Sequence, residues 1–81
     1  MNFSLALEIL KNGGMVRRDG WNGVGMWLEL QEPDENSKMT LPYLFLNYPA
    51  GSKAYPEGAR VPWLASQTDL LAEDWVGVEF K

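Results

Sequence analysis

The sequence predicts an α+β fold: a small antiparallel sheet of about four or more strands, with an N-terminal helix and a short C-terminal helix. Apolar residues repeat with helical spacing near the N-terminus, whereas several later segments alternate as strands do. The 81 residues are enough for one domain, and a domain of this size is stabilised only modestly by its own core. We therefore expect residues 1–81 to form a single domain that assembles as an oligomer.

The first helix is predicted by apolar residues at positions i, i+3, i+4 and i+7, namely Phe3, Ala6, Leu7 and Leu10. Gly13 and Gly14 would end it, because glycine has the backbone freedom that a C-terminal cap needs. Leu5 and Ile9 widen the apolar stripe beyond what one small sheet requires. The excess apolar surface could face another subunit.

Four segments have the composition of strands, at residues 15–18, 26–31, 40–47 and 75–80. Residues 19–25 read as a glycine-rich turn and residues 32–38 as a polar turn. The stretch at about residues 48–62 is rich in proline and glycine and has no apolar period, so we expect a loop excursion or a protruding hairpin there. Loops of this length are frequently functional.

The short C-terminal helix begins at a recognisable cap. Ser66 can accept a hydrogen bond at the N-terminus, and Asp69 stands three residues later in the capping-box position. This pattern predicts a helix that runs to about Ala72.

Alternation along the predicted strands separates two sets of side chains. Aliphatic residues form one set: Leu28, Leu30, Leu44, Leu46, Val76, Val78 and Phe80. Aromatic residues form the other: Trp27, Tyr43, Phe45 and Trp75. Because two short helices can cover only one face of such a sheet, we expect the aromatic face to meet a subunit or a ligand.

Composition excludes several classes of function. The net charge of −4 opposes binding to nucleic acid polymers or anionic membranes. With no cysteine and no histidine, the chain has no disulfide, no thiolate or imidazole metal ligand and no histidine to act as a catalytic base. We expect no cofactor and no metal. The N-terminus lacks the basic start and long apolar stretch of a signal peptide, so the expected location is cytoplasmic.

Outside the polar turn with Glu32, Asp34 and Glu35, one dense carboxylate cluster could supply oxygen ligands for a cation, at Asp69, Glu73 and Asp74. Its spacing matches no calcium loop. A helix start at Asp69 and a solvated face at Glu73 explain it better.

Four tryptophans favour binding over chemistry. Trp21 beside Asn22 offers a stacking plane next to an amide, and the helix start at Ser66 offers donors suited to a phosphate. Each has an ordinary alternative: the rings could be core, Asn22-Gly23 a turn and Ser66 only a cap. Nucleotide binding and a purely structural role both remain open on these residues.

Two longer runs resemble the Thoeris anti-defence 2 family of phages and prophages. They are Gly20-Trp21-Asn22-Gly23 with Gly25-Met26-Trp27-Leu28, and residues 61–69 (VPWLASQTD) with Ala72-Glu73-Asp74-Trp75. The resemblance extends from Met1 to about Val78. It implies a tetrameric sponge that sequesters a cyclic ADP-ribose signal of bacterial Thoeris defence without cleaving it. Some members also hold cyclic oligonucleotides at a separate site.

The resemblance also implies a ligand site between subunits, with rings against the adenine and ribose and polar groups on the pyrophosphate. On the matching positions we predict stacking residues in Trp21, Trp27 and Trp75, a phosphate partner in Arg18, polar selectors in Asn22 and Asp74, and supporting roles for Trp63 and Ser66. The alternative function is a protein-binding module that inhibits a host enzyme through the exposed aromatic face. The third possible function is a phosphodiesterase that uses carboxylates for catalysis.

Overall fold

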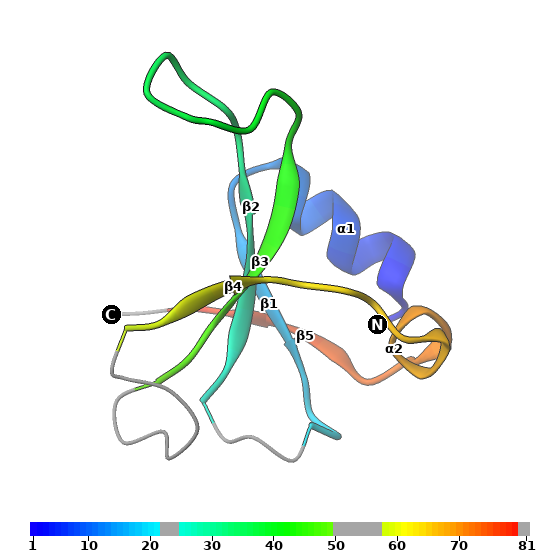
Figure 1. Ribbon diagram of the computed structural model, residues 1–81. Helices are drawn as coiled ribbons and strands as arrows, with labels where there is room; N and C mark the ends of the chain where they lie inside the picture. The colour runs from blue at the N-terminus through cyan, green and yellow to red at the C-terminus, as the bar shows by residue number, and fades with distance from the viewer. Residues whose placement is uncertain (22–24, 50–57, 80–81) are drawn as a thin grey trace.

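The structure is a computed structural model, and it describes residues 1–21, 25–49 and 58–79. Its elements are α1 (Phe3–Lys11), β1 (Met15–Arg18), β2 (Trp27–Gln31), β3 (Tyr43–Asn47), β4 (Arg60–Pro62), α2 (Gln67–Leu71) and β5 (Trp75–Val78). The strands form one five-stranded sheet in the order β4-β3-β2-β1-β5, and every neighbouring pair is antiparallel (Figure 1). The predicted α+β class is confirmed.

Local signals at both ends of α1 explain its bounds. The side chain of Asn2 accepts a hydrogen bond from the Leu5 amide at 3.0 Å, which satisfies one free donor of the first turn. After the helix, Gly13 adopts φ +88°, a conformation that residues with a side chain rarely take. The chain then turns directly into β1, as the Gly13-Gly14 pair predicts.

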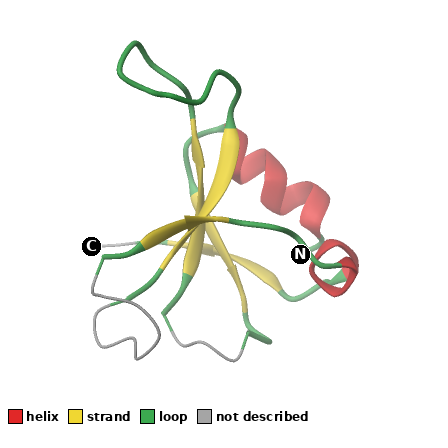
Figure 2. Cartoon of the chain, viewed as in Figure 1, coloured by secondary structure: helices red, strands yellow, loops and turns green. Residues whose placement is uncertain are grey.

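The core lies between α1 and one face of the sheet. Ala6 and Leu10 of α1 meet Val16, Leu28 and Trp75, and all five side chains are fully buried. Each buried Val or Leu contributes about 1.5–3 kcal/mol relative to an exposed position. Both helices lie on the same side of the strands (Figure 2), so the core has a single layer.

Strand pairing confirms part of the predicted division into faces. Leu28 lies opposite Leu46, and Val16 lies opposite Leu28, so these side chains share the face toward α1. Trp27, Phe45 and Tyr43 occupy the alternate positions and therefore the other face. Within the described ranges no helix covers that open face (Figure 2).

The prediction of which β5 side chains lie on each face of the sheet is wrong. Arg18 pairs with Trp75 and Val16 with Gly77, which places Trp75 on the face toward α1 and puts Val76 and Val78 on the open face. Alternation relates residues within one strand only, and the relation between distant strands depends on their register. Phe80, assigned to the aliphatic set, lies outside the described residues.

The stretch predicted as an excursion contains a strand that the sequence reading missed. Residues 60–62 form β4, which pairs with β3 through Phe45 and Pro62, Leu46 and Val61, and Asn47 and Arg60. Three residues ending in proline carry too little alternation to indicate a strand, and Pro62 is tolerated because β4 is an edge strand. Residues 50–57 of the predicted excursion lie outside the described part of the chain.

The second helix has the predicted cap. The Ser66 hydroxyl accepts a hydrogen bond from the Asp69 amide at 3.1 Å, and the Asp69 carboxylate accepts one from the Ser66 amide at 3.1 Å. This reciprocal capping box starts α2 at Gln67. Neither helix in the described residues has the length and apolar character to span a bilayer.

Candidate functional site

Several predicted ligand residues meet where β1 ends, beside α2 and the start of β5. Arg18 is the last residue of β1 and pairs across the sheet with Trp75. Its guanidinium donates from Nε to Asp74 Oδ1 at 2.8 Å and from Nη1 to Asp69 Oδ1 at 2.8 Å. Trp21 Nε1 also donates to Asp69 Oδ1, at 3.2 Å. The structure thus brings four of the predicted residues together: Arg18, Trp21, Asp74 and Trp75.

Ion pairs at this end join Arg18 to Asp69 and Asp74. Hydrogen bonds from Arg18 lower the pKa of Asp74, and contacts with Asp74 and then Asp69 raise the pKa of Arg18. Burial by itself would raise the pKa of Asp69, but hydrogen bonds from Arg18, Trp21 and Ser66 outweigh it and lower that pKa. One guanidinium between two carboxylates leaves a local charge of about −1, which opposes a phosphate. An anion at Arg18 would lie close to both carboxylates, whose charges repel it.

The tryptophans at this end form an aromatic cluster that belongs to the core. Trp75 is fully buried, and its Nε1 donates to the Asp69 carbonyl at 2.9 Å. Trp21 and Trp63 meet its ring edge to face, with centroids 5.4 and 6.0 Å away, and Phe3 lies at 5.2 Å. Trp21 and Trp63 are half-buried and keep some accessible surface. No accessible surface of Trp75 remains for a ligand, so the structure gives it a packing role.

The remaining predicted residues divide among three places. Ser66 serves as the cap of α2, and its hydroxyl also lies 2.8 Å from that of Thr68. Trp27 lies on the open face, away from the Arg18 end. Asn22 lies outside the described residues. Among those that are described, no three acidic side chains come together as a metal site, and Asp69 and Asp74 contact Arg18 instead.

A second group of residues lies on the open face, where Trp27 is the one member that was predicted as a ligand residue. Glu29 Oε2 accepts hydrogen bonds from Trp27 Nε1 at 3.1 Å and from Asn47 Nδ2 at 2.8 Å. Asn47 is only 3% exposed, and its Oδ1 accepts from Arg60 Nε at 3.1 Å. The guanidinium carbon of Arg60 lies 5.9 Å from the centre of the Phe45 ring. Strands β2, β3 and β4 thus contribute one connected polar and aromatic surface.

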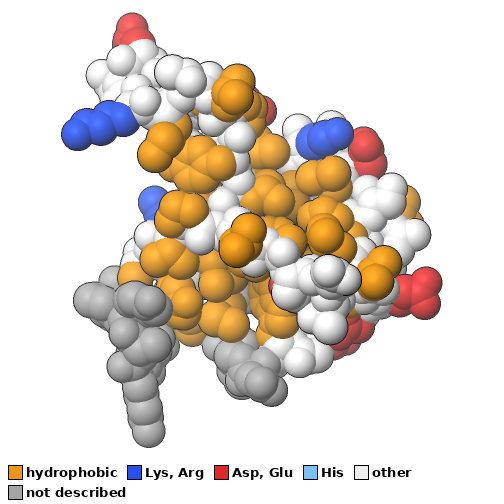
Figure 3. Space-filling view, turned by 45° about the vertical axis from the view of Figure 1, so that its right-hand side comes forward, with side chains coloured by type: hydrophobic (Ala, Val, Ile, Leu, Met, Phe, Trp, Pro, Cys, Tyr) orange, Lys and Arg blue, Asp and Glu red, His pale blue; other side chains and the backbone are white. Residues whose placement is uncertain are grey.

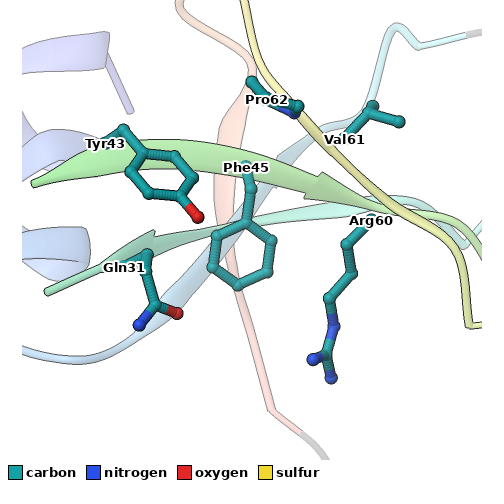
Figure 4. Close-up of a pocket in the computed structure, with 6 residues that line it drawn as sticks. All are labelled: Gln31, Tyr43, Phe45, Arg60, Val61 and Pro62. Atoms are coloured by element: carbon teal, nitrogen blue, oxygen red, sulfur yellow. The ribbon is translucent and has the colours of Figure 1, made fainter. Parts of the chain in front are cut away.

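A pocket of about 210 Å³ opens beside this network. It is lined by Gln31, Tyr43, Phe45, Arg60, Val61 and Pro62. Figure 4 shows the Phe45 ring between the Gln31 amide and the Arg60 guanidinium. Stacking rings, an amide and a cation are the groups that recognise nucleotides. The aromatic alternation in β3 was a usable signal for this surface, but Arg60 could not be placed on it without the pairing of β4.

Comparison with known proteins identifies the family. Residues 1–78 match the model of the Thoeris anti-defense 2-like domain. The chain is also 41% identical to "Thoeris anti-defense 2" of Bacillus phage SP01 over an alignment of 81 positions, which covers 93% of this chain and 91% of the phage protein.

The chain belongs to the Thoeris anti-defense 2-like family. The resemblance to this family, which two tryptophan-bearing runs indicated, is confirmed over nearly the whole chain. Membership of this family supports an anti-defence role. The matched residues 1–78 include both the Arg18 end and the open face of the sheet.

Proposed function

We propose that this protein is an anti-defence sponge: it binds a cyclic nucleotide immune signal, a cyclic ADP-ribose isomer, and holds it without cleaving it. The observation that carries the proposal is the family match over residues 1–78. Sequestration requires affinity and slow release but no catalytic group. A protein without histidine or cysteine can therefore perform it.

The open face supports this function by its chemistry. Trp27 and Phe45 occupy it and are partly accessible, and Tyr43 is 37% exposed. A base stacked on one such ring gains about 1–3 kcal/mol. Asn47 and Arg60 add polar groups next to the rings. A flat, phosphate-bearing molecule matches this combination of surfaces.

Assembly into a homotetramer is part of the proposal, with the signal held at a contact between subunits. Large apolar side chains are exposed on the chain by itself, and they include Leu5, Met39, Leu41, Leu64, Leu70 and Leu71. Figure 3 shows hydrophobic side chains gathered across the visible face of the molecule. Soluble monomers seldom leave such patches open, and a stable contact needs about 800 Å² from each partner. We place this assembly in the cytoplasm of the infected or lysogenic host, where it can meet the signal.

Native mass spectrometry with a panel of cyclic nucleotides tests binding and assembly together. The proposal predicts a tetramer that gains the mass of whole cyclic ADP-ribose isomers. A monomer that gains no nucleotide would contradict it. If such a monomer instead captured one host enzyme, the protein-binding alternative would replace the sponge.

A further inference from the structure

Arg60 differs from the other arginines of the described chain in having no carboxylate partner there. Arg17 pairs with Asp19 at 2.8 Å, and Arg18 lies between Asp69 and Asp74. The hydrogen bond that Arg60 makes within the described residues uses its Nε. Its terminal N–H groups therefore keep their capacity to bind an anion.

A buried amide holds Arg60 in position. Asn47 Nδ2 donates to Glu29 Oε2 at 2.8 Å and to the Trp27 carbonyl at 3.4 Å, so the orientation of the amide is determined. Its Oδ1 is then directed to Arg60 Nε. Because Asn47 is 3% exposed, water does not compete freely for these bonds. The guanidinium is thus fixed at one atom and available at its other end.

The pocket places flat rings beside that guanidinium. Phe45 lies 5.9 Å from the Arg60 guanidinium carbon, and the centroids of Tyr43 and Phe45 are 6.5 Å apart. Gln31 donates from Nε2 to the Glu32 carbonyl at 3.0 Å, which leaves its side-chain oxygen as an acceptor toward the pocket (Figure 4). The same small space therefore offers an anion donor, two ring surfaces and a hydrogen-bond acceptor.

We propose that this pocket binds a nucleoside phosphate group, with Arg60 as the phosphate partner and Phe45 and Tyr43 against the base. This inference rests on the proposed function, and it names the residues that hold one nucleotide unit of the signal. At about 210 Å³ the pocket is smaller than a site that encloses a whole drug-sized ligand. The rest of a cyclic nucleotide would extend over the open face. The Arg18 end, with two carboxylates around one cation, is the poorer place for a phosphate.

Titration of the isotope-labelled protein with adenosine 5′-monophosphate, followed by NMR, tests the site directly. We expect the signals of Phe45, Tyr43 and the Arg60 Nε–H to shift, and adenosine, which lacks the phosphate, to bind more weakly. Arg60→Gln should weaken the monophosphate about 10- to 100-fold, because it removes hydrogen bonds from a charged donor. Arg17→Gln makes the same change of charge at a residue paired with Asp19, and it should change affinity by less than about 2-fold.

The contrary outcomes distinguish a failure of this inference from a failure of the proposed function. Equal losses in Arg60→Gln and Arg17→Gln would indicate general attraction of anions. Shifts confined to Trp21 and Arg18 would place the phosphate at the other end, and inorganic phosphate acting as strongly as the monophosphate would remove the base contact. If Arg60→Gln still captures the cyclic signal as the wild type does, this inference fails and the sponge stands. If the wild type captures no cyclic signal but binds the monophosphate at Arg60, the sponge fails and the site stands.

Discussion

Replacing Trp75 with alanine distinguishes a core residue from a ligand residue. The indole is fully buried between Phe3, Trp21 and Trp63, with ring centroids 5.2 to 6.0 Å away. Truncation of a buried aromatic side chain to alanine costs about 3–5 kcal/mol. Loss of the bond from Nε1 to the Asp69 carbonyl adds about 1 kcal/mol. An 81-residue domain has about 4–12 kcal/mol of stability in total, so Trp75→Ala should lose a large share of it.

Urea unfolding followed by circular dichroism measures this loss as a change in the free energy of unfolding. Protein concentration must be held constant, because assembly makes the apparent stability depend on it. Trp21→Ala is the matched control: the ring is half-buried at the edge of the same cluster, and we expect a smaller loss of about 1–2 kcal/mol. A loss below about 1 kcal/mol in Trp75→Ala, together with lost binding of the signal, would refute the reasoning and restore Trp75 as a ligand ring.

Three further predictions concern stability. The fold lowers the pKa values of Asp69 and Asp74 from 3.8, so these carboxylates add their full contribution to the free energy of unfolding above that pH and lose it as the pH falls below. Urea unfolding at pH 5 and pH 2 should show this loss of stability, and Arg18→Gln should make the difference between the two pH values smaller. Ser66→Ala should cost about 1 kcal/mol by removing the cap of α2, whereas Ser66→Thr should retain most of it in the same assay. Gly13→Ala should cost about 1 kcal/mol by thermal or urea unfolding, because φ is +88° and nothing within 4 Å would clash; an unchanged midpoint would argue against that conformation.

Sequence reasoning predicted the elements whose signals are local. The first helix follows from its apolar spacing and the Gly13-Gly14 stop, and α2 follows from Ser66 and Asp69, which sit three residues apart. The open aromatic face was predictable across β2 and β3 because each strand alternates clearly, and their pairing preserves that alternation. The signals for these features all come from residues that are close together in the sequence.

The errors arise where distant segments meet. Whether Trp75 faces the core depends on its pairing with Arg18, and the two are far apart in sequence. The same holds for Arg60, which reaches the open face only because β4 pairs with β3. The ion pairs around Arg18 likewise join β1 to α2 and to the start of β5. The family resemblance implied Arg18 as a phosphate partner, but only the fold shows that two carboxylates already contact it.

Recovery of the signal after heating tests the proposed sequestration most directly. The protein is mixed with the Thoeris cyclic ADP-ribose signal, the free signal is measured, and the sample is then heat-denatured and measured again. We predict that free signal falls on mixing and that the intact molecule returns to solution after heating. Signal that never falls, or that returns only as cleavage products, would contradict a non-catalytic sponge.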